Sequence, residues 1–136
     1  DFLNFGLNYT FTSTYDGAEA DDPNRNQSYT NNQMVRVPRN IINLDTNVKI
    51  PGYENLDLTL KTKWSDMARD YGNGNRTYSD ERIDDYLVSD LLIKYNLQNS
   101  YDLFLNITNI LDEKYETTRD YSQMDRALNF GIKSSY

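Results

Sequence analysis

The chain has no cysteine and no histidine among its 136 residues. Without cysteine it can form no disulfide, no thiolate nucleophile and no cysteine-based metal site. Without histidine it lacks the commonest general base and the commonest neutral metal ligand. Aspartate and glutamate number 21, yet no spacing among them singles out a catalytic pair. Nothing in the sequence therefore predicts an enzyme.

Long apolar runs and an excess of positive charge are also missing. No apolar stretch approaches the ~18 residues that a membrane-spanning helix needs. The opening segment, DFLNFGLNYT, lacks the basic and continuous apolar regions of a signal peptide and already has a strand pattern. The formal net charge of -7 argues against a nucleic-acid partner. The length predicts one domain at most, and we expect the chain to be the C-terminal part of a longer protein.

What the chain does contain is alternation of apolar and polar residues. Hydrophobic residues make up 38%, below the roughly 45–50% of soluble domains, but aromatics at 13% are too plentiful for a disordered chain. In the first segment, Leu3, Phe5 and Leu7 alternate with Asn4 and Gly6. A period of two residues is typical of β-strands. The strands are predicted near residues 1–15, 37–50, 54–65, 83–96, 100–111 and 125–136.

The connections between these segments alternate in length. Short turns at 51–54 (PGYE) and 96–99 (NLQN) follow the second and fourth strands. Long polar connections cover roughly 16–36, 66–82 and 112–124. This alternation predicts an all-β, antiparallel up-and-down meander with every long connection at one rim. Connections beyond ~12–15 residues are uncommon in compact domains unless they have a function.

Strand length and aromatic placement favour a membrane barrel over a soluble sandwich. The segments exceed the usual ~5–6 residues and approach the ~9–11 that cross a bilayer as a tilted strand. In such a barrel the apolar side faces lipid and the hydrophilic side faces a wet interior. Aromatic residues that anchor strands at both membrane surfaces are expected too. They are Tyr9, Phe11 and Trp64 near the long connections and Tyr95, Tyr101 and Tyr136 near the short turns. The alternative is a sandwich whose core these aromatics cap.

Charges on the hydrophilic side predict a register. Opposite charges directly across two strands contribute about 0.2–1 kcal/mol each. The expected pairs are Asp45 with Lys61, Lys49 with Asp57 and, if Tyr95 faces Tyr101, Lys94 with Asp102.

Three segments resemble one protein family. LFLNITNILDEKYE (103–116) resembles the penultimate strand and following loop of TonB-dependent outer-membrane receptors, where an Asn-Leu-Phe-Asp-like motif precedes a Lys-Tyr pair. RALNFGIKSSY (126–136) resembles their closing strand, and VPRNIINLDTNVKIP (37–51) resembles a strand that they begin with Pro-Arg. The resemblance covers essentially the whole chain. It implies the C-terminal part of a barrel of about 22 strands, without the plug domain and the earlier strands.

The resemblance also implies a function. Such receptors sit in the outer membrane of Gram-negative bacteria and take up a scarce nutrient, cobalamin (vitamin B12) or a ferric siderophore, with energy relayed by TonB. YETTRDYSQMDR (115–126) is similar to the pattern of cobalamin receptors, although Asp120 and Asp125 stand where glycine is usual. Implied partners are membrane lipid, the barrel-assembly machinery, TonB through the missing N-terminal region and the nutrient. Alternatives are a porin-like channel and a soluble carbohydrate- or calcium-binding β-module.

Aromatic side chains in the long connections are candidates for ligand binding. They bury a large area on a flat or macrocyclic ligand and lose little side-chain entropy. They can equally pack the connections together. The predicted ligand-binding residues are Tyr71, Tyr78, Tyr115, Tyr121 and Arg126.

Two further groups are weaker candidates. Leu128, Phe130, Ile132 and Tyr136 resemble the C-terminal signal read by the barrel-assembly machinery, and an alternating strand with a free edge can augment another sheet. The acidic run Asp16, Glu19, Asp21 and Asp22 offers oxygen ligands for calcium, as acidic loops of cobalamin receptors do. Its spacing matches no EF-hand loop, so a solvated acidic loop is the alternative. No other cofactor is expected.

Overall fold

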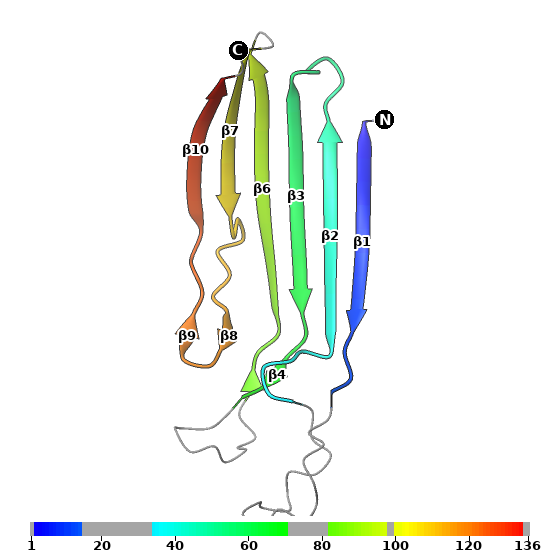
Figure 1. The fold of residues 1–136 in the computed structure, drawn as a ribbon, viewed down its shortest axis with the longest axis vertical. Coiled ribbons are helices and arrows are strands. Elements are labelled where there is room, and N and C mark those ends of the chain that lie inside the picture. Colours follow the sequence, from blue (N-terminus) through cyan, green and yellow to red (C-terminus); the bar gives the residue numbers. More distant parts are fainter. Residues whose placement is uncertain (1, 15–33, 71–81, 98–99, 135–136) are drawn as a thin grey trace, which may run out of the picture.

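The computed structural model describes residues 2–14, 34–70, 82–97 and 100–134. Six strands form a single sheet in the order β1-β2-β3-β6-β7-β10, with every neighbouring pair antiparallel (Figure 1). They are β1 (Leu3–Phe11), β2 (Asn40–Lys49), β3 (Leu56–Ser65), β6 (Tyr86–Leu97), β7 (Tyr101–Thr108) and β10 (Ala127–Ser134). The predicted six-stranded antiparallel meander is confirmed. In the described ranges, no helix is long and apolar enough to cross a membrane.

Two small hairpins extend the sheet at one end only. β4 (Ala68–Arg69) pairs with β5 (Arg82–Ile83), and β8 (Glu116–Thr118) pairs with β9 (Tyr121–Ser122). Figure 1 shows β8 and β9 below β7 and β10, and β4 below β3, at the same end of the sheet. We call this the loop end, and the opposite end, with the short β2–β3 and β6–β7 connections, the turn end.

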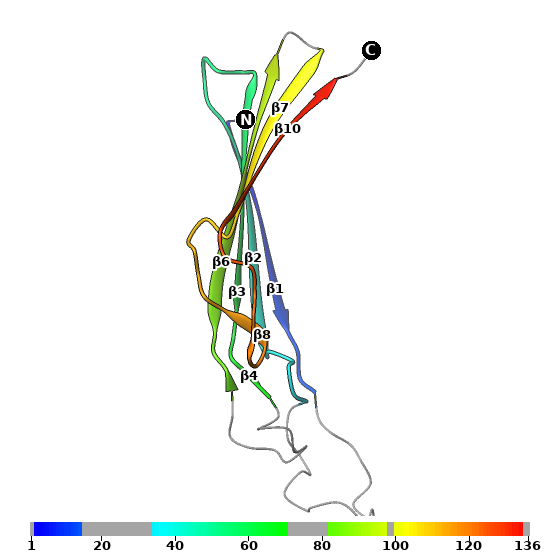
Figure 2. The same cartoon turned by 90° about the vertical axis from the view of Figure 1, so that its left-hand side faces the viewer.

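One face of the sheet is apolar across all six strands. One row runs from β1 to β10 through directly opposite residues: Leu3, Val48, Leu58, Ile93, Leu105 and Phe130. Figure 2 shows the sheet nearly edge-on as a single twisted layer. No second layer of described residues covers the row, and Phe130 is 75% exposed. The apolar face is therefore not the sealed core of a sandwich.

The β2–β3 turn follows from Pro51 and Gly52. Proline presets the φ angle of the first central turn position, and glycine at the second accepts the positive φ of a type II turn. Gly52 has φ 85°, and the Tyr53 amide donates a hydrogen bond to the Ile50 carbonyl at 2.9 Å. The predicted register of this hairpin is confirmed. The observed partners include Asp45 with Lys61 and Lys49 with Asp57, and the second pair lies 3.8 Å apart.

The predicted register of β6 and β7 is wrong by two residues. Asn96, not Lys94, lies directly opposite Asp102, and Tyr95 does not face Tyr101. A slip of two residues leaves every side chain on its original face, so alternation alone fits both registers. The observed register gives Asp102 two partners. The Asn96 side-chain amide donates to it at 2.8 Å, and the Lys94 ammonium lies 3.2 Å away on the diagonal.

The other face of the sheet is hydrophilic and carries rows of alternating charge. Asp45, Lys61 and Asp90 lie in one row across β2, β3 and β6. Phe104 is an apolar exception on this face. Its ring lies over Gly131 on the neighbouring strand, and a Cβ atom at position 131 would overlap the ring. Glycine leaves room there for the aromatic side chain to lie flat against the backbone.

Candidate ligand-binding site at the loop end

Burial in this molecule is concentrated at the loop end. Few described residues are buried, and none of them lies in the turn-end half of the sheet. They are Ser65, Ala68, Asp70, Ile83, Tyr86, Ser89 and Asn109. Four of the seven are polar or charged, so specific hydrogen bonds must accompany this packing.

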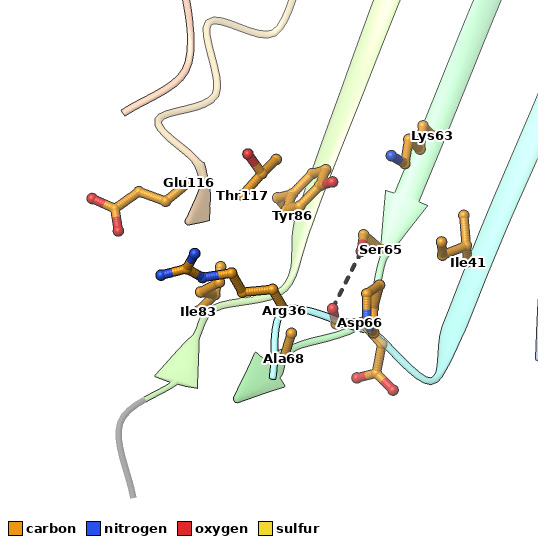
Figure 3. Close-up of a pocket in the computed structure, with 11 residues that line it drawn as sticks. Arg36, Ile41, Lys63, Ser65, Asp66, Ala68, Ile83, Tyr86, Glu116 and Thr117 are labelled. Atoms are coloured by element: carbon orange, nitrogen blue, oxygen red, sulfur yellow. Dashed lines mark hydrogen bonds between the residues drawn. The ribbon is translucent and has the colours of Figure 1, made fainter. Parts of the chain in front are cut away.

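A cavity of about 220 Å³ opens beside these residues, on the hydrophilic face. Its floor comes from Ile41, Ser65 and Tyr86, which lie side by side on β2, β3 and β6. Figure 3 shows Arg36 on one side of the cavity and the β8 segment with Thr117 on another. Four separate parts of the chain thus enclose one space.

A second, more polar cavity of about 310 Å³ adjoins the first. The two share Ile83 and Glu116, so they lie next to each other at the loop end. Tyr115 and Lys114 also line the second cavity. Lys114 forms an ion pair with Asp125, and this hydrogen bond raises the pKa of Lys114. Its positive charge is therefore already paired.

Two stacked phenol rings and one ammonium group lie where the cavities meet. The rings of Tyr86 and Tyr115 have centroids 4.5 Å apart and are tilted by 35°. The Lys63 ammonium lies 5.7 Å from the centre of the Tyr86 ring, within range of a cation–π contact. Burial, and then the neighbouring Tyr86 and Asp90, raise the pKa of Tyr115, which keeps its phenol neutral at ordinary pH. In the described part of the chain, Lys63 has no carboxylate partner.

The carboxylates that line the first cavity are engaged elsewhere. Glu116 accepts a hydrogen bond from the Asp120 amide at 2.9 Å, and Figure 3 shows its carboxylate pointing away from Tyr86. Asp66 accepts hydrogen bonds from the Asn40 side chain at 2.7 Å and from the Met67 amide at 2.9 Å. Among the described residues that line the first cavity, the Lys63 ammonium is the charged group placed over the Tyr86 ring.

The motif Asn109-Ile110-Leu111-Asp112 is a loop anchor. Asn109 has φ 50° and Asp112 φ 56°, a backbone conformation that asparagine and aspartate tolerate better than most residues. The Asn109 side chain accepts a hydrogen bond from the Glu113 amide at 2.9 Å. It also donates to the carbonyls of Glu113 and Met124, at 2.9 and 3.3 Å. These bonds hold the β7–β8 connection together at the edge of the cavities.

Asp112 completes this anchor through Arg126. The Arg126 amide donates to the Asp112 carboxylate at 3.0 Å, and the guanidinium donates to the Ile110 carbonyl at 3.3 Å. The hydrogen bond from the Arg126 amide lowers the pKa of Asp112, and the charges of Lys114 and Arg126 lower it further. Arg126 therefore lines neither cavity in this structure, and its role in ligand binding stays a prediction.

The other predicted ligand-binding residues differ in position. Tyr115 reaches the cavities, whereas Tyr121 is 70% exposed and lines neither of them. Tyr71 and Tyr78 lie outside the described residues. The structure tests none of these four as ligand contacts.

The predicted calcium and assembly residues also remain untested. Asp16, Glu19, Asp21 and Asp22 lie outside the described residues, as does Tyr136. Within the described ranges, no group of three or more acidic residues is arranged to hold a metal ion. Leu128, Phe130 and Ile132 lie exposed on the edge strand β10, on its apolar side.

Asp120 explains one departure from the family pattern. Its φ of 61° lies in the left-handed region, which favours glycine and which aspartate tolerates. The aspartate therefore keeps the β8–β9 turn that a glycine would form. Asp125, which also stands where the pattern has glycine, forms an ion pair with Lys114.

None of the residues that line the first cavity was predicted from the sequence as a site residue, and neither was Asp70. Among the lining residues are Arg36, Lys63 and Tyr86. For Lys63 and Tyr86 a signal existed, since alternation places both on the hydrophilic face at the loop end of their strands. For Arg36 and Asp70 no local pattern indicated that they would meet.

Comparison with known families agrees with this architecture. The family model of the TonB dependent receptor-like β-barrel matches residues 1–110. The chain belongs to the TonB-dependent receptor β-barrel family. Membership places it in the outer membrane of a Gram-negative bacterium and in a family of receptors. The alternatives of a porin-like channel and of a soluble β-module are thereby excluded. Among curated proteins no match was found.

Solved receptors share the fold at low sequence identity. The siderophore receptor PiuA of Acinetobacter baumannii matches 96% of this chain with 21% identity and a TM-score of 0.67. The pyoverdine receptor FpvA of Pseudomonas aeruginosa matches 100% with 16% identity and a TM-score of 0.75. The ferric-catecholate import receptor Fiu of Escherichia coli matches 96% with 13% identity and a TM-score of 0.74. The chain spans only 18%, 19% and 18% of these receptors, respectively.

Proposed function

We propose that this chain is part of a receptor that takes up a ferric siderophore, and that the siderophore contacts the loop-end cavities. The observation that carries the proposal is the Lys63 ammonium beside the stacked rings of Tyr86 and Tyr115. Ferric complexes of catecholate siderophores are anionic and present flat aromatic rings. A cation and two phenol faces complement both properties. The named receptors for siderophores support the same substrate class.

The rest of the proposal concerns partners. The apolar face would contact membrane lipid, because its exposed Leu7, Leu128 and Phe130 have no described protein cover. Release into the cell would require TonB, acting through parts of the receptor beyond this chain, and insertion would require the barrel-assembly machinery. The chain itself would bind and guide its cargo without catalysis.

Cobalamin is the second candidate nutrient. Its support is the segment 115–126, where Asp120 preserves the turn that the cobalamin-receptor pattern builds with glycine. A corrinoid is bulky and lacks the negative charge of a ferric catecholate. Whether binding depends on Lys63 therefore distinguishes a ferric siderophore from cobalamin.

The test compares two lysines on the same face of β3. Lys63→Met removes the ammonium beside Tyr86, whereas Lys61→Met removes one two residues further from the loop end, opposite Asp45 and Asp90. Equilibrium binding is measured on the intact receptor with ferric enterobactin and ferripyoverdine, and with cyanocobalamin as competitor. We expect Lys63→Met to weaken binding of one ferric complex about tenfold, roughly 1.4 kcal/mol, and Lys61→Met to change it less than about threefold.

Equal effects of the two variants would show that the cavity is not the site. Tight binding of cyanocobalamin, unaffected by either variant, would establish the second candidate instead.

A further inference from the structure

Three long connections of the chain meet at one buried carboxylate, that of Asp70. Its Oδ1 atom accepts a hydrogen bond from Arg36 Nε at 2.8 Å, and its Oδ2 atom accepts one from the Arg119 amide at 2.7 Å. Arg36 belongs to the β1–β2 connection, Asp70 follows β4, and Arg119 lies in the β8–β9 turn. The side chain of Asp70 is fully buried, whereas that of Arg36 is 46% exposed.

One partner of Asp70 lines the first cavity, and the other lies close in sequence to residues that line it. Arg36 itself lines the cavity, and Arg119 follows Glu116 and Thr117, which line it on the other side. Asp70 does not line the cavity. Its two oxygens thus connect the Arg36 wall with the segment that follows Glu116 and Thr117.

The backbone at Arg36 shows that this wall needs support. Arg36 has φ 61°, a conformation that costs an ordinary side chain free energy and persists only when surrounding contacts fix it. The Arg36 amide donates to the Arg69 carbonyl at 2.7 Å, so the backbone and the side chain of Arg36 are both held by residues 69 and 70.

We propose that Asp70 is a positioning residue of the ligand site: it fixes the distance between the Arg36 wall and the Glu116–Thr117 wall before any ligand arrives. The expected effect of Asp70 on ligand binding rests on the proposed function. The fixed distance between the two walls does not. Preformed walls improve affinity because these segments need not become ordered when the ligand binds, and such ordering costs free energy.

Asp70→Asn is the sharpest test of the geometry, because it preserves shape. An amide offers only one acceptor oxygen, so its NH₂ group must face either the Arg36 Nε–H or the Arg119 N–H, both of which are donors. One of the two hydrogen bonds to residue 70 is then lost. Asp57→Asn is the matched control, since Asp57 also pairs with one cation, Lys49, but lies at the turn end.

The distance between the walls can be measured without ligand. The chain has no cysteine, so Met34→Cys and Tyr121→Cys, both at exposed positions, supply the attachment sites for spin labels within it. In the intact receptor we expect a narrow distance distribution, unchanged by Asp57→Asn and broadened by Asp70→Asn. A distribution that Asp70→Asn leaves superimposable on that of the parent overturns the proposal.

Binding then gives the second readout. With ferric enterobactin or ferripyoverdine, whichever the receptor binds, Asp70→Asn should raise Kd about tenfold through slower association. If neither complex binds, the proposed function fails, while the distances still decide the role of Asp70. If Asp70→Asn prevents assembly, Arg36→Met removes the same bond from the exposed side, because a methyl group without a donor replaces the Nε–H. It should broaden the distribution likewise, and an unchanged distribution overturns the proposal.

Discussion

The strands and the loop end of this molecule are stable for different reasons. The strands form one layer, and their apolar side chains pack against no described protein segment. The loop end contains the buried residues, and their polar groups are paired with named partners such as Arg36 and Glu113. The stability of the strands therefore depends on the medium around the protein, whereas the stability of the loop end depends on contacts within the protein. An exposed apolar face of this extent would be an aggregation site in water, which supports the proposal that it contacts lipid.

The largest expected effect comes from placing a charge on the apolar face. Leu105→Lys puts an ammonium near the middle of that face, where a lysine in lipid costs about 2–4 kcal/mol. Asn106→Lys, the next residue of the same strand, puts the same group on the hydrophilic face. We expect Leu105→Lys to lower the free energy of unfolding in lipid vesicles by that amount and Asn106→Lys to change it by less than about 0.5 kcal/mol.

Urea titration of the intact receptor in vesicles measures both values. If the two variants lose similar amounts of unfolding free energy, lipid does not contact the apolar face. The strands and the loop end would then not differ in what stabilises them.

At the loop end, the corresponding change is Asn109→Ala. It removes three side-chain hydrogen bonds and places alanine at φ 50°. Loss of these part-buried hydrogen bonds costs about 1–3 kcal/mol in total, and the left-handed backbone adds about 1. Asn109→Gly loses the same bonds without the backbone penalty.

Hydrogen exchange separates this effect from one on the strands. Amides of residues 110–124 should exchange faster in Asn109→Ala and somewhat less so in Asn109→Gly, while those of β2 and β3 keep their protection. Loss of protection throughout the sheet would show that the two regions unfold as one unit.

The same division explains what the sequence could predict. Alternation sets which face each strand residue occupies, so the meander and the apolar face followed from the sequence directly. Opposite charges predicted the register of β2 and β3, and the Pro51-Gly52 turn agrees with that register. No comparable signal fixed the β6–β7 turn. A slip of two residues changes no face there, and only the pairing of Asn96 with Asp102 distinguishes the registers.

The site was harder to predict because it depends on contacts between distant segments. Arg36 and Asp70 are 34 positions apart, and Asp70 and Arg119 are 49 apart, in connections without periodicity. Tyr115 could be predicted as a site residue because it is an aromatic residue in a long polar connection. Its partner Tyr86 belongs to a strand, and only the fold shows that the connection after β7 lies over it.

The smallest expected effect concerns an exception among the strands, the packing of Phe104 over Gly131. Gly131→Ala forces the ring aside, and we expect it to lower the free energy of unfolding by about 1 kcal/mol. In a Phe104→Ala background the same change meets no ring, and alanine in a strand is better than glycine by about 0.5–1 kcal/mol. The sign of the effect should therefore reverse. A double-mutant cycle measured by urea titration in vesicles gives the coupling between the two positions. If Gly131→Ala has the same effect in both backgrounds, the ring contributes no packing, and the hydrophilic face is held by its backbone ladder alone.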